Sequence, residues 1–300
     1  MRFPDVLASG ARVALVAPSG PLAGDADLVR AVENARRLGW EPVQGTNAAA
    51  REDYLAGTDE ERLADLQRAI SDDTIDAVWC LRGGYGAMRL LPGLDLSPLA
   101  RRPKAIIGYS DITALHAAIG RAAGIVSYHG PTARAEISDF SLDSLGRAVV
   151  RQVDPCGMAP MGHTVVPGRA AGPLAGGNLA LLAALAGTPY APSYDGAILV
   201  LEDVSEYTFR VDRMLTQLML AGSLGRIAGL AFGAFTDIPA DDNGGAAALV
   251  ALLERTARAL RVPCVRGVPV GHIADQWTLP LGALAELDAD ACTLHVAMPA

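Results

Sequence analysis

The pattern of apolar and polar positions in the first half of the chain predicts strands that alternate with helices. Residues 12–18 form a short apolar run, and residues 25–39 follow with apolar side chains at helical spacing. The alternation continues with expected strands at 75–84, 104–110 and 125–131 and expected helices at 58–73 and 111–124. Thr58 and Glu61 have the spacing of a capping box at the start of one of these helices. Such an order is typical of a parallel sheet whose two faces are covered by helices.

The second half has a different pattern, and a segment rich in glycine and proline separates the two halves. This segment, residues 152–172, has little periodicity, and we interpret it as a connection that includes a short strand at 163–166. Beyond it we expect helices at 176–190, 210–225 and 244–260, strands at 196–204 and 227–235, and a terminal hairpin around Asp288–Asp290. The expected architecture is α/β with two domains, residues 1–151 and residues 173–300.

Composition and charge narrow the class of protein. The chain has 300 residues, of which 51% are hydrophobic, and a formal net charge of −8. Lysine and arginine never form a run longer than two residues, which argues against a surface that binds nucleic acid. We find no continuously apolar run long enough to span a membrane and no apolar core of a signal peptide, so we expect a cytoplasmic protein that does not contact membranes.

The cysteines and the glycine-rich segment exclude several kinds of cofactor site. Cys80, Cys156, Cys264 and Cys292 form no CxxC pair, so we expect neither structural zinc nor a disulfide framework. In residues 80–92 (CLRGGYGAMRLLP) the Lys–Ser/Thr pair of a phosphate loop is missing, and an arginine stands where a dinucleotide fingerprint needs its last glycine. The consecutive glycines can present backbone N–H groups to a ligand, or they can form a plain tight turn.

Ser110 follows the next expected strand directly, and its position allows two interpretations. A serine between a strand and a helix is most often an N-cap. It can also be a nucleophile exposed on a sharp turn, with the N–H of Asp111 able to stabilise an oxyanion. The hydrolase motif G-x-S-x-G is incomplete, because Ile112 replaces the last glycine. Residues 82–86 end the neighbouring strand, so both segments are expected at the crevice where α/β folds bind ligands.

A serine nucleophile needs a base and an orienting carboxylate, and spacing alone does not select them. Among the five histidines, His116 lies within the expected helix and is better explained by packing, whereas His129 and His272 each follow an apolar run. His163 lies in the connection and His295 in the terminal hairpin. Glu202 ends an apolar strand, and it can serve as the carboxylate or form an ordinary ion pair with Arg210 or Arg213.

Seven segments, in order along the chain from about Val13 to Ala283, resemble the LD-carboxypeptidase family of serine peptidases. They are VAPSGP, LRGGYGAMRLLP, IGYSDITALH, YHGP, GGNLALLAALAGTPY, LVLEDVSEYTFRVDRMLTQL and GHIADQWTLPLGA. The resemblance implies a glutamine-amidotransferase-like N-terminal domain and a swivelling β/β/α C-terminal domain. It also implies that the site lies between the two domains, a common location for a pocket.

The same resemblance assigns roles to individual residues. It implies Ser110 as nucleophile, Glu202 as carboxylate and His272 as base, without metal or cofactor. The N–H groups of Asp111 and Gly84 would form the oxyanion hole, and the amide of Asp111 would matter more than its side chain. Four residues are expected to bind substrate: Arg82, Gly83, Tyr85 and Asn178.

The implied reaction is hydrolysis of the amide before a C-terminal D-amino acid. The expected substrate is a cytoplasmic murein tetrapeptide that ends in D-alanine, the pathway is cell-wall recycling, and the expected assembly is a homodimer. A related branch of the family hydrolyses peptidyl-nucleotide antibiotics and gives self-immunity. A binding protein that keeps the fold without catalysis is a third hypothesis.

Overall fold

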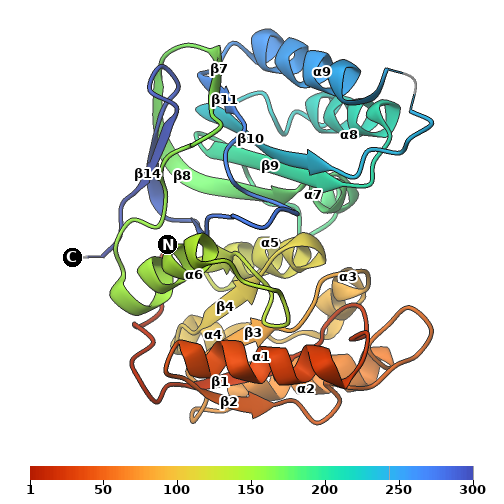
Figure 1. Cartoon of the computed structure of the whole chain (residues 1–300), viewed down its shortest axis with the longest axis vertical. Coiled ribbons are helices and arrows are strands. Elements are labelled where there is room, and N and C mark those ends of the chain that lie inside the picture. The colour runs from red at the N-terminus through yellow and green to blue at the C-terminus, as the bar shows by residue number, and fades with distance from the viewer. Residues whose placement is uncertain (243, 300) are drawn as a thin grey trace.

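The structure is a computed structural model that describes residues 1–242 and 244–299. Two α/β units lie one above the other, and each has its own sheet (Figure 1). The first half of the chain builds the lower unit, and most of the second half builds the upper one. The predicted two-domain α/β architecture is therefore confirmed.

The N-terminal sheet has five parallel strands and one antiparallel edge strand. Its order is β12-β5-β4-β3-β1-β2. The parallel strands are β1 (Arg12–Val16), β2 (Glu41–Gln44), β3 (Ala77–Cys80), β4 (Ala105–Gly108) and β5 (Ser127–His129). The edge strand β12 (Leu279–Leu281) comes from the second half, where we had expected part of the hairpin. Its three residues are buried, because they cover the free edge of β5; an edge strand also tolerates Pro280.

Helices cover both faces of this sheet, as the alternation predicted. Val13 and Leu15 of β1 pack toward one face, and Ala14 and Val16 pack toward the other. The first face is covered by α1 (Asp25–Arg37) and α6 (Asp139–Gly146). The second is covered by α2 (Asp59–Ser71), α3 (Ala87–Leu90), α4 (Ser97–Arg101) and α5 (Thr113–Ala122). The predicted Thr58–Glu61 capping box is present at the start of α2.

The C-terminal sheet has eight strands in the order β6-β14-β13-β8-β9-β10-β11-β7. Its strands are β6 (Gly157–Met158), β7 (His163–Val166), β8 (Arg169–Asn178), β9 (Ile198–Val204), β10 (Gly229–Thr236), β11 (Cys264–Arg266), β13 (Leu284–Asp288) and β14 (Thr293–Val296). The central strands β8 to β11 are parallel. One face is covered by α7 (Leu179–Leu185), α8 (Thr208–Leu220) and α9 (Gly245–Leu260). The predicted strand at 163–166 and the terminal hairpin are both confirmed.

The two units meet where α5 begins and β8 ends. The N–H of Asn178 donates to Oγ1 of Thr113 over 3.0 Å. A Cβ on Gly177 would lie 2.6 Å from the same hydroxyl oxygen, and the φ of this residue is +130°. Glycine is therefore required there, both for space and for backbone conformation. This close contact brings the segment after Ser110 beside the carboxyl ends of β8 and β9, where Glu202 lies.

In the part of the chain that the structure describes, no helix has both the length and the apolar character needed to cross a bilayer.

Candidate active site

Ser110 lies on a sharp turn at the carboxyl end of β4. Its φ is +64°, a left-handed conformation that few residues other than glycine adopt. The glycine segment after β3 packs directly against it, since a Cβ on Gly83 would lie 2.9 Å from the Cβ of Ser110. Ser110 begins a short 3-10 helix whose N-cap residue is Tyr109. Ser110 is therefore not the N-cap.

His272 joins Ser110 to a buried carboxylate. Its Nε2 lies 3.1 Å from Oγ of Ser110, and its Nδ1 lies 2.9 Å from Oε2 of Glu202. Because a carboxylate only accepts, Nδ1 carries the proton and Nε2 is free to accept from the serine hydroxyl. Glu202 is 0% exposed in β9, and a Cβ on Gly271 would lie 2.8 Å from its Oε2. Three segments that are far apart in the sequence thus form one hydrogen-bonded chain.

The two arginines that were considered as ion-pair partners of Glu202 make other contacts. Arg210 forms its ion pair with Glu206, at 3.8 Å, and Arg213 lies over the ring of Phe209. The ion-pair alternative for Glu202 is therefore wrong.

The remaining histidines lie apart from the serine. His116 is buried, with Nδ1 2.9 Å from the Ser127 hydroxyl and Nε2 2.8 Å from the Gly108 carbonyl. His129 is also buried, and its ring packs edge-on against Tyr109. His163 is exposed, and His295 contacts Asp154.

The two buried histidines are expected to make the protein sensitive to acid. Burial lowers the pKa of His116 to about 4 and the pKa of His129 to about 3. Unfolded histidines have a pKa of about 6.5, so below that pH the unfolded chain binds protons that the folded chain does not. The contribution of these two histidines to the free energy of unfolding is therefore fully present above pH 6.5 and decreases toward about pH 4, by up to about 1.4 kcal/mol per pH unit for each histidine. The buried carboxyl groups of Asp111 and Asp203, whose pKa values burial raises, act in the opposite direction.

Urea denaturation between about pH 7 and about pH 5 measures this effect. His129→Gln removes one buried base, so its unfolding free energy should depend less steeply on pH than that of the wild type. His163→Gln removes an exposed histidine and serves as the matched control. Equal pH dependence in His129→Gln and the wild type would show that His129 is not the source.

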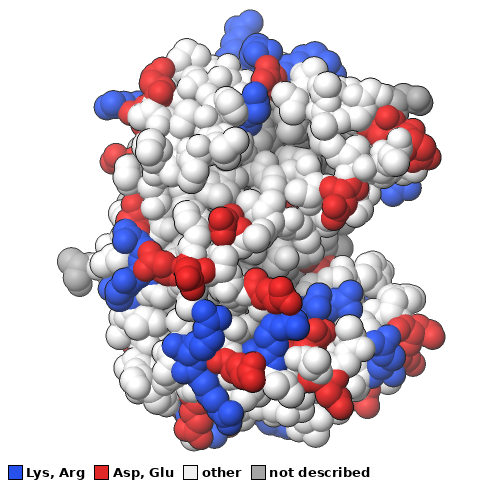
Figure 2. Space-filling view, viewed as in Figure 1, with Lys and Arg blue, Asp and Glu red and all other residues white. Residues whose placement is uncertain are grey.

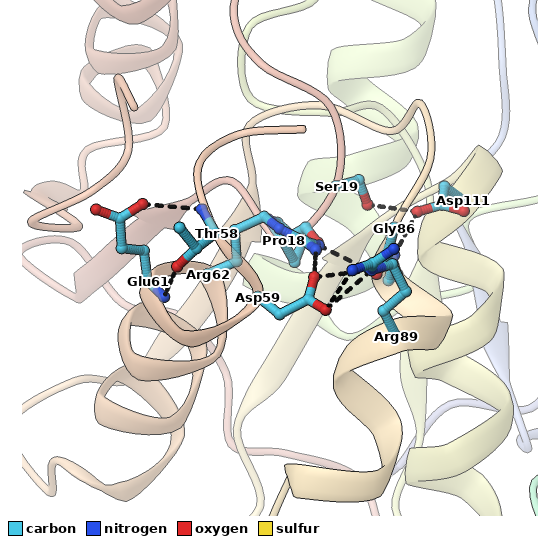
Figure 3. A network of polar contacts seen from close by, with 10 residues as sticks. Pro18, Ser19, Thr58, Asp59, Glu61, Arg62, Gly86, Arg89 and Asp111 are labelled. Carbon is cyan, nitrogen blue, oxygen red and sulfur yellow. Dashed lines mark hydrogen bonds and ion pairs between the residues drawn. The ribbon is translucent and has the colours of Figure 1, made fainter. Parts of the chain in front are cut away.

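The carboxylate of Asp111 ties together the loops around the serine. Its Oδ2 accepts from the Ser19 hydroxyl over 2.6 Å and from the Ala87 N–H over 2.8 Å (Figure 3). Burial raises the pKa of Asp111. The Asp111 side chain therefore has a structural role beside the one expected for its amide. The carboxylate links the turn after β1 to the glycine segment after β3.

A buried arginine also links the turn after β1 to the glycine segment after β3. Arg62 is 1% exposed, and its Nη1 donates to the carbonyls of Pro18 (2.5 Å) and Gly86 (3.0 Å). Asp59 binds both Arg62 and Arg89 (Figure 3). The sequence pattern predicted the helix that carries Arg62, but nothing local indicated that its guanidinium crosses to two other loops.

The residues expected to bind substrate differ in how exposed they are and in what they contact. Arg82 is partly buried and donates to the Pro21 carbonyl, while Gly83 contacts Ser110. Tyr85 is 56% exposed, and its ring lies 5.6 Å from that of Tyr54. Asn178 is 3% exposed; its amide donates to Asp203, and its oxygen caps α7. The side chain of Asn178 therefore holds the end of β8 in place.

Comparison with known proteins identifies the family. Residues 13–130 match the LD-carboxypeptidase N-terminal domain, and residues 171–287 match the LD-carboxypeptidase C-terminal domain. The chain belongs to the LD-carboxypeptidase family, and it is a peptidase.

Relatives of known name and structure are similar over nearly the whole chain. The murein tetrapeptide carboxypeptidase of Pseudomonas aeruginosa is 36% identical over 93% of this chain and 94% of its own. The solved structure of muramoyltetrapeptide carboxypeptidase from Oxalobacter formigenes is 32% identical, with a TM-score of 0.85 over 97% of this chain and 100% of that one. MccF in complex with glutamyl sulfamoyl guanosine has a TM-score of 0.88 over 99% and 98%, but its 22% identity shows a shared fold alone.

Proposed function

We propose that the chain is a serine LD-carboxypeptidase with Ser110 as nucleophile, His272 as general base and Glu202 as the orienting carboxylate. The observation that carries this proposal is the continuous chain of hydrogen bonds from Glu202 through His272 to Ser110. The left-handed turn at Ser110 exposes its Oγ, as in other hydrolases with a strand-to-helix nucleophile. The buried carboxylate fixes the imidazole and stabilises the imidazolium that forms during the reaction.

The proposed reaction has two steps. His272 accepts the proton of Ser110 while Oγ attacks the carbonyl carbon of the last amide, and the tetrahedral intermediate collapses as His272 gives that proton to the departing amine. The D-amino acid leaves, and an acyl-serine ester remains. Water then attacks the ester carbonyl while His272 accepts a proton from the water. His272 gives that proton to Oγ of Ser110 as the ester C–O bond breaks, which releases the shortened peptide and restores Ser110.

Backbone N–H groups would stabilise the negative charge on the carbonyl oxygen. We assign this role to the amides of Asp111, which directly follows Ser110, and of Gly84, which follows Gly83, whose backbone packs against Ser110. Loss of one such donor typically costs about 3 kcal/mol of transition-state stabilisation. The bonds from Asp111 to Ser19 and Ala87 would keep the glycine segment in position for this role.

The proposed substrate is a murein tetrapeptide that ends in D-alanine. The support comes from two relatives above 30% identity that are named for murein or muramoyl tetrapeptides. MccF is named for self-immunity to microcin C7 and shares the fold at lower identity, so cleavage of peptidyl nucleotides is the alternative. Tyr85 and Gly83 remain proposed substrate contacts, whereas the buried side chain of Asn178 favours a positioning role. Cytoplasmic action in cell-wall recycling and a homodimeric assembly also remain proposals.

The test is release of free D-alanine from a murein tetrapeptide, followed by mass spectrometry of the remaining tripeptide. The proposal expects release from the tetrapeptide and no cleavage of a matched tetrapeptide that ends in L-alanine. A panel that includes a glutamyl sulfamoyl nucleoside tests the alternative. Turnover of the nucleoside without cleavage of any murein peptide would replace the proposed substrate.

A further inference from the structure

Two arginines lie side by side at the carboxyl edge of the N-terminal sheet. The segment after β5 runs back along the end of β3: Ala133 N–H donates to the Cys80 carbonyl over 3.0 Å, and Arg134 N–H to the Leu81 carbonyl over 3.4 Å. Arg134 is thus placed beside Arg82, the residue after Leu81. Asn34 of α1 fixes this segment, because its buried amide donates to the Ala133 and Ala135 carbonyls.

The negative charge around these two guanidinium groups is too small to balance them. Among the described residues, no carboxylate lies within ion-pair distance of Arg82, whose Nη1 donates only to the Pro21 carbonyl. Within residues 1–242 and 244–299, Asp27 is the single acidic partner of Arg134, at 3.2 Å, and it also pairs with Arg30 at 3.5 Å. Nε of Arg134 is buried and has no hydrogen-bond partner. The two guanidinium groups are partly exposed and repel each other, and an anionic ligand bound between them would reduce that repulsion.

The arginine pair adjoins the proposed catalytic residues. Arg82 directly precedes Gly83, whose backbone packs against Ser110. Burial raises the pKa of the Tyr109 phenol, and the positive charge of Arg134 partly opposes that rise. Arg134 therefore lies near Tyr109. The Tyr109 ring in turn lies 4.8 Å from the His272 ring. Figure 2 shows basic and acidic side chains together on the N-terminal side of the hollow between the two units.

We propose that Arg134, together with Arg82, binds a carboxylate of the peptide substrate and so sets the specificity of the enzyme. This inference rests on the proposed function. The carboxylate supplies the charge that the pair lacks, and a planar guanidinium can bind it through two parallel hydrogen bonds. Asp27 and the Asn34-bound segment hold Arg134 in place before substrate arrives, which reduces the ordering cost of binding. Either of two carboxylates of the peptide can bind there: the C-terminal carboxylate of the leaving residue, or a carboxylate on the side chain of the third residue.

Matched peptides distinguish these two sources. The first pair is a D-alanine-terminated tetrapeptide and its C-terminal amide, and the second pair differs only by a carboxylate on the third side chain. We expect Arg134→Gln to lower kcat/KM for the full tetrapeptide about 10- to 100-fold, mainly through KM. The same substitution should have little effect on whichever peptide lacks the bound carboxylate. Arg134→Lys should recover part of the loss, and Arg36→Gln, at the exposed far end of α1, is the charge-matched control.

Calorimetric titration of Ser110→Ala with the same peptides separates this inference from the proposed reaction. If the wild type releases no D-alanine, the proposed function fails, yet binding still tests the arginine pair. Tighter binding of a carboxylate-bearing peptide than of its matched partner, lost in Ser110→Ala/Arg134→Gln, supports the inference. Absence of binding, or an equal loss for every peptide in the Arg134 variant, overturns it.

Discussion

Replacing Ser110 with alanine is expected to lower the rate of D-alanine release by at least about 10⁴-fold, because the acyl-serine intermediate can no longer form. The loss should appear in kcat, since the peptide contacts remain intact. Binding measured by calorimetry should therefore change little. The rate is measured as free D-alanine under single-turnover conditions, and a serine-directed fluorophosphonate should label the wild type and not the variant.

The strained backbone at Ser110 calls for a control with the same conformation. Ser205 has a φ of +61°, close to the +64° of Ser110, and its side chain is exposed. Ser205→Ala should therefore carry a similar backbone cost without loss of activity. Similar activities in Ser110→Ala and the wild type would exclude Ser110 as nucleophile. Similar losses in both alanine variants would assign the effect to the turns and not to the hydroxyl.

Periodicity predicted most of the longer strands and helices because that information is local, whereas short elements such as β2 and β11 were not predicted. The parallel core of the first sheet and the terminal hairpin follow from apolar spacing and turn residues. The antiparallel strand β12 was missed, because a three-residue strand has too few positions to show a period. It forms because β5 offers an unpaired edge, and that edge exists only once the sheet has assembled.

In the candidate site, too, some features depend on neighbouring residues and could be predicted, whereas others depend on contacts between residues far apart in the sequence. The turn at Ser110 could be placed from its neighbours, since strand, glycine and helix start all lie within a few residues. Its hydrogen-bonded partner His272 lies 162 residues away, and no spacing rule connects the two. Only the resemblance proposed that pairing. The bonds of Asp111 to Ser19 and of Arg62 to Pro18 were not anticipated, because they depend on how loops from different strands meet at one edge.

These loop contacts give the site a physical basis for a fixed geometry. The turn after β1 and the glycine segment after β3 are secured twice, once by the Asp111 carboxylate and once by the Arg62 guanidinium. Both groups are buried, so their hydrogen bonds are little weakened by competing water. An oxyanion hole made of backbone amides depends on such rigidity, because its donors contribute only when they are aligned before the reaction.

Replacing Glu202 with glutamine is expected to lower kcat by about 10³- to 10⁴-fold with little change in the fold. Glutamine has nearly the same shape, but it carries no charge to stabilise the imidazolium. It can also turn its NH₂ group toward Nδ1, which would force His272 into the tautomer that cannot accept the Ser110 proton. Burial makes the effect large, because Glu202 is 0% exposed and water cannot replace the missing charge.

The matched control for this charge loss is Glu206→Gln. Glu206 lies four residues further along the chain and pairs with Arg210 instead of a histidine. Its replacement should leave kcat within about threefold of the wild type, since it removes only a partly exposed ion pair. Glu202→Asp keeps the charge but withdraws it from Nδ1, so its kcat should fall between those of Glu202→Gln and the wild type. If kcat is the same in Glu202→Gln and the wild type, the carboxylate does not act through His272, and the proposed triad reduces to a serine–histidine pair.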